Sequence, residues 1–135
     1  MKVVLDANVV IAACGWRGQP YACLMAMARR RLFAFATAAT LEETRVTAHA
    51  LIEQGRLRHG ALPALNWYLT AVCLVEPAPL GKRRSRDPKD DPYLACALSA
   101  GARAVVTFDR DLLDLGKPFG IAMWQPRQLL DALSD

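Results

Sequence analysis

Four carboxylates in this chain stand where apolar segments give way to polar ones, and together they could hold a divalent metal ion. They are Asp6, Glu43, Asp91 and Asp109. Like charges are not gathered for stability, because mutual repulsion and loss of hydration both disfavour it. A cation such as Mg²⁺ or Mn²⁺ removes that objection, since it takes oxygen ligands from carboxylates. The spacing therefore predicts an acidic metal site.

Other catalytic chemistry has little support in the sequence. No Ser/His/Asp or Cys/His arrangement is present, which disfavours covalent catalysis, and His49 and His59 have no partner pattern. The cysteines show neither a C-x-x-C motif nor zinc spacing, so we expect small buried hydrophobes in a reducing compartment. They are Cys14, Cys23, Cys73 and Cys96.

The composition is that of a folded globular protein. The chain has 135 residues, of which 53% are hydrophobic and 22% charged, which suits one domain spanning 1–135 with a single core. No apolar run is long enough to span a membrane, and the N-terminus lacks the layout of a secretory signal. We expect a cytoplasmic protein. The net charge of +4 leaves a basic exterior around an acidic pocket, which suits a polyanionic substrate.

Apolar runs and turn signals predict strands that alternate with helices. The expected strands are 2–5, 32–36, 72–75, 104–107 and 121–124. The expected helices are 21–31, 37–54, 62–71, 90–100, 111–115 and 127–133, with a loop between the first strand and the first helix.

This alternation predicts an α/β fold with a parallel sheet covered on both faces. In such folds, sites form at the carboxyl ends of the strands. Asp6 and Asp109 follow strands, Asp91 begins a helix, and Glu43 lies in the first turns of its helix. The predicted fold therefore brings the four acids to one edge of the sheet.

The segment Leu5-Asp6-Ala7-Asn8 bears on the reaction type. A strand-terminal Asp also begins haloacid-dehalogenase phosphatases, but those enzymes need a second Asp where Asn8 stands. A phosphatase of small substrates is therefore a disfavoured alternative. We expect Asn8 to hold Asp6 in place by hydrogen bonds instead.

Two further stretches carry a family resemblance. Asp90-Asp91-Pro92-Tyr93-Leu94-Ala95 and Val106-Thr107-Phe108-Asp109-Arg110-Asp111, together with Asp6-x-Asn8, resemble PIN-domain ribonucleases. The chain is most similar to PIN proteins that are toxin components of toxin–antitoxin pairs, relatives of the VapC-like toxins. The resemblance runs from Val3 to about Leu133 and is best matched between Asp87 and Leu113. It implies a three-layer α/β/α sandwich around a parallel, about five-stranded sheet, with acidic residues that bind Mg²⁺ or Mn²⁺.

The same resemblance implies a role for each acid. Asp6 is the first ligand, and Glu43 is the second, with Glu42 as an alternative register. Asp91 is the third ligand, with Asp90 as its exposed neighbour. Asp109 is the fourth, and Thr107 and Asp111 lie close to it in a supporting role.

The function implied is metal-dependent endoribonuclease, as the toxin of a toxin–antitoxin pair. The expected partners are single-stranded or looped RNA, a small antitoxin protein that covers or enters the acidic cleft, and a second copy in a homodimer. A basic cluster upstream of Asp91 is expected to contact the RNA backbone, unless it is only a solvated loop; it comprises Lys82, Arg83, Arg84 and Arg86. The alternatives are a non-catalytic PIN-like RNA-binding or scaffold module, and acids that merely cap helices and turns.

Overall fold

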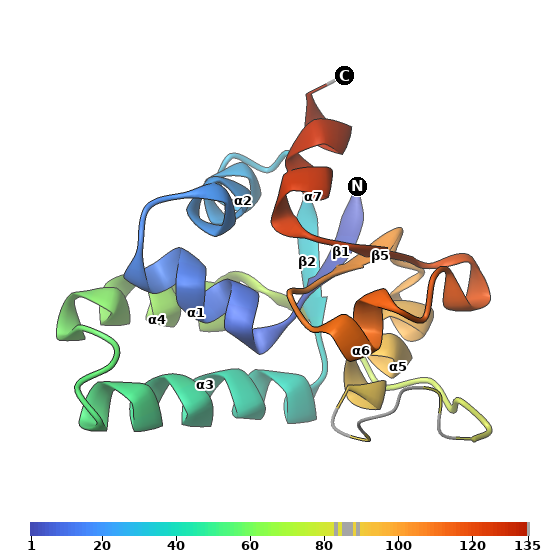
Figure 1. The fold of residues 1–135 in the computed structure, drawn as a ribbon, viewed down its shortest axis with the longest axis horizontal. Helices are drawn as coiled ribbons and strands as arrows, with labels where there is room; N and C mark the ends of the chain where they lie inside the picture. Colours follow the sequence, from blue (N-terminus) through green and yellow to red (C-terminus); the bar gives the residue numbers. More distant parts are fainter. Residues whose placement is uncertain (83, 85–87, 89, 135) are drawn as a thin grey trace.

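The computed structural model describes residues 1–82, 84, 88 and 90–134, in which five parallel strands alternate with helices (Figure 1). The strands are β1 (Lys2–Leu5), β2 (Phe33–Ala36), β3 (Cys73–Leu74), β4 (Ala104–Val106) and β5 (Ala122–Trp124). The α-helices are α1 (Ala7–Gly15), α2 (Gln19–Ala28), α3 (Ala38–Glu53), α4 (Leu62–Ala71), α5 (Asp91–Ala100), α6 (Arg110–Leu113) and α7 (Pro126–Leu133). Two short 3₁₀ helices are η1 (His59–Ala61) and η2 (Pro118–Gly120). The predicted α/β fold with a parallel sheet of five strands is confirmed.

The strand order places a topological switch point at the centre of the sheet. The order is β3-β2-β1-β4-β5, so the chain builds outward from β1 on one side and then returns to add β4 beside it. Leu5 of β1 pairs with Val106 of β4, and the residues that follow both strands therefore leave the sheet next to each other. A crevice between connections that diverge from such a point is the usual place for a site in parallel sheets.

The central strand β1 sends its side chains alternately to two apolar layers. Val3 and Leu5 pack with α1, α2 and α4, whereas Val4 packs with α5 and α6. Figure 1 shows α1 to α4 on one side of β1 and β2, and α5 and α6 on the other. Val3, Val4 and Leu5 of β1 are at most 3% exposed, so the acid that follows this strand stands on a rigid support.

The helix α1 was not predicted, because residues 6–20 were expected to form a loop. Its sequence has a β-branched run, Val9-Val10-Ile11, which disfavours a helix in isolation. Seven of its nine residues are buried, so it shows no apolar stripe with a period of 3.6 residues. Tertiary burial on nearly all sides stabilises this helix, and sequence periodicity could not reveal it.

The other elements lie close to their predicted positions, with smaller differences at the ends. Helix α2 begins at Gln19, with Pro20 in its first turn, and ends at Ala28 rather than Arg31. Arg30, with a φ of 60°, cannot continue a right-handed helix. Cys73 is exposed, so the prediction of four buried cysteines is wrong at this position. Within the described ranges, no helix is long and apolar enough to cross a membrane.

Candidate active site

Asp6 directly follows the central strand β1, at the carboxyl edge of the sheet. We call this part of the sheet the acidic edge. The Asp6 N–H donates to the Val106 carbonyl at 2.9 Å, and its side chain is only 6% exposed. The Thr107 hydroxyl donates to Oδ2 at 2.7 Å. Burial raises the pKa of Asp6, the Thr107 hydrogen bond lowers it, and the charges of Glu43 and Asp109 raise it further. Water therefore stabilises the ionised form of the Asp6 side chain poorly.

Glu43 reaches the same edge from α3. This helix begins with a capping box in which Thr37 and Thr40 exchange side-chain and backbone hydrogen bonds, which fixes the register of its first turns. The buried Tyr93 donates its hydroxyl to Glu43 Oε2 at 2.7 Å. Glu42 instead accepts a hydrogen bond from Arg45 Nε at 3.0 Å on the exposed face of the helix. Of the two registers considered, the one with Glu43 faces Asp6.

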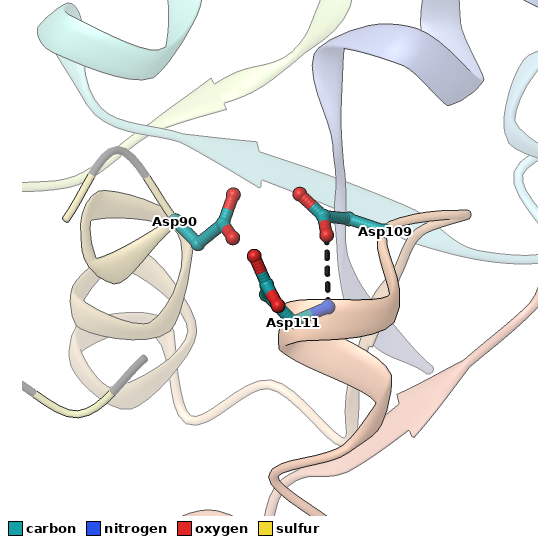
Figure 2. A group of neighbouring side chains, drawn as sticks. All are labelled: Asp90, Asp109 and Asp111. Atoms are coloured by element: carbon teal, nitrogen blue, oxygen red, sulfur yellow. Dashed lines mark hydrogen bonds between the residues drawn. The ribbon is translucent and has the colours of Figure 1, made fainter. Parts of the chain in front are cut away.

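Three aspartates from two further elements face one another, as Figure 2 shows; the charge of one of them, Asp109, acts on Asp6. Asp90 immediately precedes α5, Asp109 is the N-cap of α6, and Asp111 lies in its first turn. One carboxylate oxygen from each lies within 4.8 Å of the others. Asp109 Oδ1 accepts from the Asp111 N–H at 2.9 Å. We call these residues the aspartate triad, and Asp6 with Glu43 the Asp6–Glu43 pair.

Thr107 links the two groups of acids. While its hydroxyl donates to Asp6, the same oxygen accepts from the Asp109 N–H at 2.9 Å. Thr107 is fully buried between β4 and the site. One side chain therefore sets the positions of an acid after β1 and an acid after β4.

Asp90 and Asp91 differ from their expected positions. Asp90 was expected to be an exposed neighbour, but it is buried and belongs to the triad. Asp91 is half-buried, and its Oδ2 accepts the backbone N–H of Arg84 at 3.0 Å. The structure thus brings Asp90, Asp109 and Asp111 together, with Asp91 directed toward the preceding segment. The role of Asp91 as a metal ligand stays a prediction.

Asn8 does not take the place expected for it. Its side chain is exposed on α1, and in the described part of the chain it makes no hydrogen bond to Asp6. Residue 8 is already in the first turn of α1, which turns its side chain away from the sheet edge. Thr107 supplies the hydrogen bond that was assigned to Asn8.

The basic cluster divides into different environments. Arg83 and Arg86 lie outside the described residues, and Lys82 is exposed. The Arg84 guanidinium lies over the Phe119 ring, 4.9 Å from its centroid, and donates to the Leu80 carbonyl at 3.1 Å. Arg84 therefore ties its own segment to η2, which was not expected of a residue predicted to contact RNA.

Two residues at this edge escaped the sequence reasoning. Asp90 was read as surface, although the Asp90-Asp91 doublet itself was visible. Tyr93 was read only as part of a helix; it lies two residues after Asp91, on the first turn of α5. The one available signal is weak: a tyrosine hydroxyl in the first turn of a buried helix needs a polar partner, but the sequence does not say which residue that is.

The donor set suits a hard divalent cation. It consists of carboxylate oxygens from four parts of the chain, and the neighbouring charges disfavour ionisation of Asp6 when no cation is present. Mg²⁺ and Mn²⁺ prefer oxygen ligands of this kind. The residues present therefore fit a metal ion: the carboxylates of the triad lie close enough together to bind one cation, and the charge of Asp109 acts on Asp6 of the neighbouring pair.

Comparisons with known proteins agree with the fold described above. A family model described as "PIN domain" matches residues 2–111. The structure is similar to that of PAE2754 from Pyrobaculum aerophilum, with 23% identity, a TM-score of 0.69, and coverage of 99% of this chain and 90% of the other. It is also similar to FitAcB from Neisseria gonorrhoeae, with 16% identity, a TM-score of 0.50, and coverage of 93% and 98%. At these identities the two structures support the fold. No curated protein sequence matches the chain significantly.

Proposed function

Because this chain belongs to the PIN-domain family, we propose that it is a metal-dependent endoribonuclease and the toxin component of a toxin–antitoxin pair. PIN domains are generally nucleases. The observation that carries the proposal is the convergence of carboxylates at the carboxyl ends of β1 and β4. A protein that only bound RNA would gain nothing from acids that repel phosphates, unless those acids held a cation.

The cation we propose is Mg²⁺ or Mn²⁺. The sequence pattern nominates Asp6, Glu43, Asp91 and Asp109 as its ligands and catalytic residues. The geometry adds Asp90 and Asp111, whose carboxylates lie against that of Asp109. When bound, such a cation lowers the pKa of a water molecule and neutralises charge on the scissile phosphate.

The residues of the chain have three tasks in this proposal. Thr107 orients Asp6 and the backbone of Asp109 at the same time. The burial of Asp6 strengthens its attraction to a cation, because a low-dielectric surrounding screens charges less than water does. A carboxylate of the edge that does not bind the cation can accept a hydrogen bond from the attacking water, and then its proton.

The substrate we propose is single-stranded or looped RNA. Its backbone can bend into an edge lined by acids, which a stiff duplex does not do readily. The net charge of +4 favours the approach of a polyanion. Lys82, exposed a few residues before the triad, is the described member of the basic cluster that is best placed to meet phosphates.

The remaining parts of the proposal follow from the resemblance. Residues 1–135 would form one PIN-like domain, which acts in the cytoplasm. A small antitoxin protein would neutralise it by covering or entering the acidic cleft. A second copy of the chain would be a partner in a homodimer.

The test is cleavage of a 5′-labelled single-stranded RNA by the purified chain. We expect cleavage with Mn²⁺ or Mg²⁺, no cleavage with EDTA, and none by Asp109→Asn. Asp131→Asn, which changes an exposed aspartate on α7, is the matched control and should cleave normally. RNA binding without cleavage under either metal would support the non-catalytic alternative. Hydrolysis of a phosphomonoester without RNA cleavage would support the phosphatase.

A further inference from the structure

Tyr93 is a buried polar residue at the acidic edge and has no role in the reaction proposed above. It lies on the first turn of α5, is 1% exposed, and donates its hydroxyl to Glu43 Oε2 at 2.7 Å across 50 residues of sequence. Among the described residues, this is the one hydrogen bond made to the Glu43 side chain. Glu43 itself is exposed on α3.

An exposed glutamate beside another acid would not hold this position unaided. A free glutamate side chain samples several rotamers, and holding it in one of them costs conformational entropy. Burial raises the pKa of Asp6 most, and the charge of Glu43 raises it further, because the two carboxylates repel each other. Both effects disfavour the single rotamer that keeps the Glu43 carboxylate at the edge.

The surroundings of Tyr93 make it a hydrogen-bond donor. Burial raises the pKa of its hydroxyl first, and the hydrogen bond to Glu43 and the charge of Asp6 raise it further. The backbone N–H of Ala7 lowers the pKa of both Tyr93 and Asp6. The hydroxyl of Tyr93, which belongs to α5, is therefore influenced by groups from the start of α1 and from α3.

We infer that Tyr93 is a positioning residue whose buried hydroxyl binds Glu43 Oε2 and holds this carboxylate at the acidic edge, where its other oxygen would be available to a divalent cation. This inference rests on the proposed metal-dependent function. It also explains why Glu43, rather than Glu42, faces Asp6. Glu42 has Arg45 as its partner on the opposite face of α3, whereas only position 43 meets the phenol.

The variant Tyr93→Phe removes one oxygen and keeps the ring. We expect the Kd for Mn²⁺, measured by titration calorimetry on the full chain without RNA, to rise about tenfold, the size common for residues that orient metal ligands. In a Glu43→Gln background, the same change should have no further effect on the Kd. Tyr21→Phe, which removes a hydroxyl from α2 where the ring lies under Arg17, is the control and should leave the Kd unchanged.

A second measurement covers the case in which Tyr93→Phe fails to fold. In the wild-type chain with ¹³Cζ-labelled tyrosine, saturating Mg²⁺ should shift the Tyr93 resonance and leave that of Tyr21 in place. A Tyr93 resonance that does not move would overturn the inference. So would a Tyr93→Phe chain that binds Mn²⁺ within twofold of wild type, or an equal loss of affinity with and without Glu43. If the wild type cleaves RNA while any of these three results holds, the inference alone fails. A wild type that binds neither metal would overturn the proposed function as well.

Discussion

Asp6 and Glu43 are each held by a hydroxyl from a distant part of the chain, whereas Asp109 and Asp111 are held by groups within two residues of them. Thr107 reaches Asp6 across 101 residues and Tyr93 reaches Glu43 across 50. In contrast, Asp109 caps the N–H of Asp111, and its own N–H is capped by Thr107. The two acid groups share one sheet edge, but tertiary packing builds the first and local turn chemistry builds much of the second.

This difference predicts which substitutions should disturb each group of acids. The Asp6–Glu43 pair should respond to changes in the residues that orient it, even when the acids themselves are kept. The aspartate triad should respond mainly to the loss of its own carboxylates. Asp90 is the exception within the triad, because its position depends on where α5 begins.

The largest expected effect comes from removing one acid from each group. Asp6→Asn and Asp109→Asn should each lower kcat for RNA cleavage by about 10³-fold, since metal-assisted charge stabilisation contributes several kcal/mol to the barrier. Single-turnover assays with Mn²⁺ measure this. Normal cleavage by one variant would show that its group is dispensable and that the other group alone holds the cation.

The next effect separates Asp90 from Asp91. The sequence pattern predicts that Asp91→Asn abolishes cleavage. The triad geometry predicts instead that Asp90→Asn weakens Mn²⁺ binding the more, by about tenfold or above. Calorimetry on both variants gives the ranking. If Asp90→Asn leaves the affinity for Mn²⁺ unchanged and Asp91→Asn lowers it, the third ligand is Asp91, as the sequence pattern predicts.

A smaller effect is expected from Thr107→Val, which keeps the shape of the side chain and removes its hydroxyl. Asp6 loses a donor and the Asp109 N–H loses its acceptor, so the free energy of unfolding should fall by about 1–3 kcal/mol, and kcat by about tenfold. Chemical denaturation and cleavage assays measure the two effects. Thr70→Val, whose hydroxyl bonds to carbonyls of α4 on the exposed surface, should change neither. An active and equally stable Thr107→Val chain would argue that the pair does not need this hydroxyl.

The pH dependence of stability isolates the buried member of the pair. The pKa of Asp6 is raised in the folded state, chiefly by burial, so between its unfolded and folded values the folded chain binds more protons. Stability from this group therefore falls as pH rises through that window, and the loss is complete above it. Asp6→Asn should raise the Tm of the metal-free chain at neutral pH, and the difference from wild type should shrink as pH is lowered through the folded pKa. A difference that grew on acidification would mean that the charge of Asp6 is stabilised rather than penalised.

The smallest effect on stability and on Mn²⁺ affinity is expected from a substitution of Glu42, which is exposed on α3. Glu42 forms an exposed ion pair with Arg45, and such pairs contribute little to stability. Glu42→Gln should leave both Tm and Mn²⁺ affinity unchanged, while Glu43→Gln lowers the affinity. If Glu42→Gln were the variant that loses Mn²⁺, the register of the second ligand would be Glu42.

The sequence could predict those features that local patterns determine. Short apolar runs ending in polar residues predicted the five strands, and alternation with helices predicted the parallel sheet. These patterns place Asp6, Glu43 and Asp109 at the edge observed.

Features that depend on packing could not be predicted in this way. Helix α1 is apolar on nearly every side, so its periodicity carries no signal. The partner of Asp6 was expected two residues along the chain, at Asn8, but it comes from β4 through the pairing of Leu5 with Val106. The burial of Asp90 and the contact between Tyr93 and Glu43 depend on how α5 docks against α3, which no local pattern encodes.

The most direct measurement of the central claim is the anomalous difference density of Mn²⁺ in crystals of the full chain. We expect a peak at the carboxyl edge, about 2.1–2.2 Å from oxygens of the aspartate triad or the Asp6–Glu43 pair, as divalent cations of this size require. The peak should disappear in Asp109→Asn and persist in Asp131→Asn. A peak elsewhere, or none at this edge in a chain that still cleaves RNA, would contradict the account.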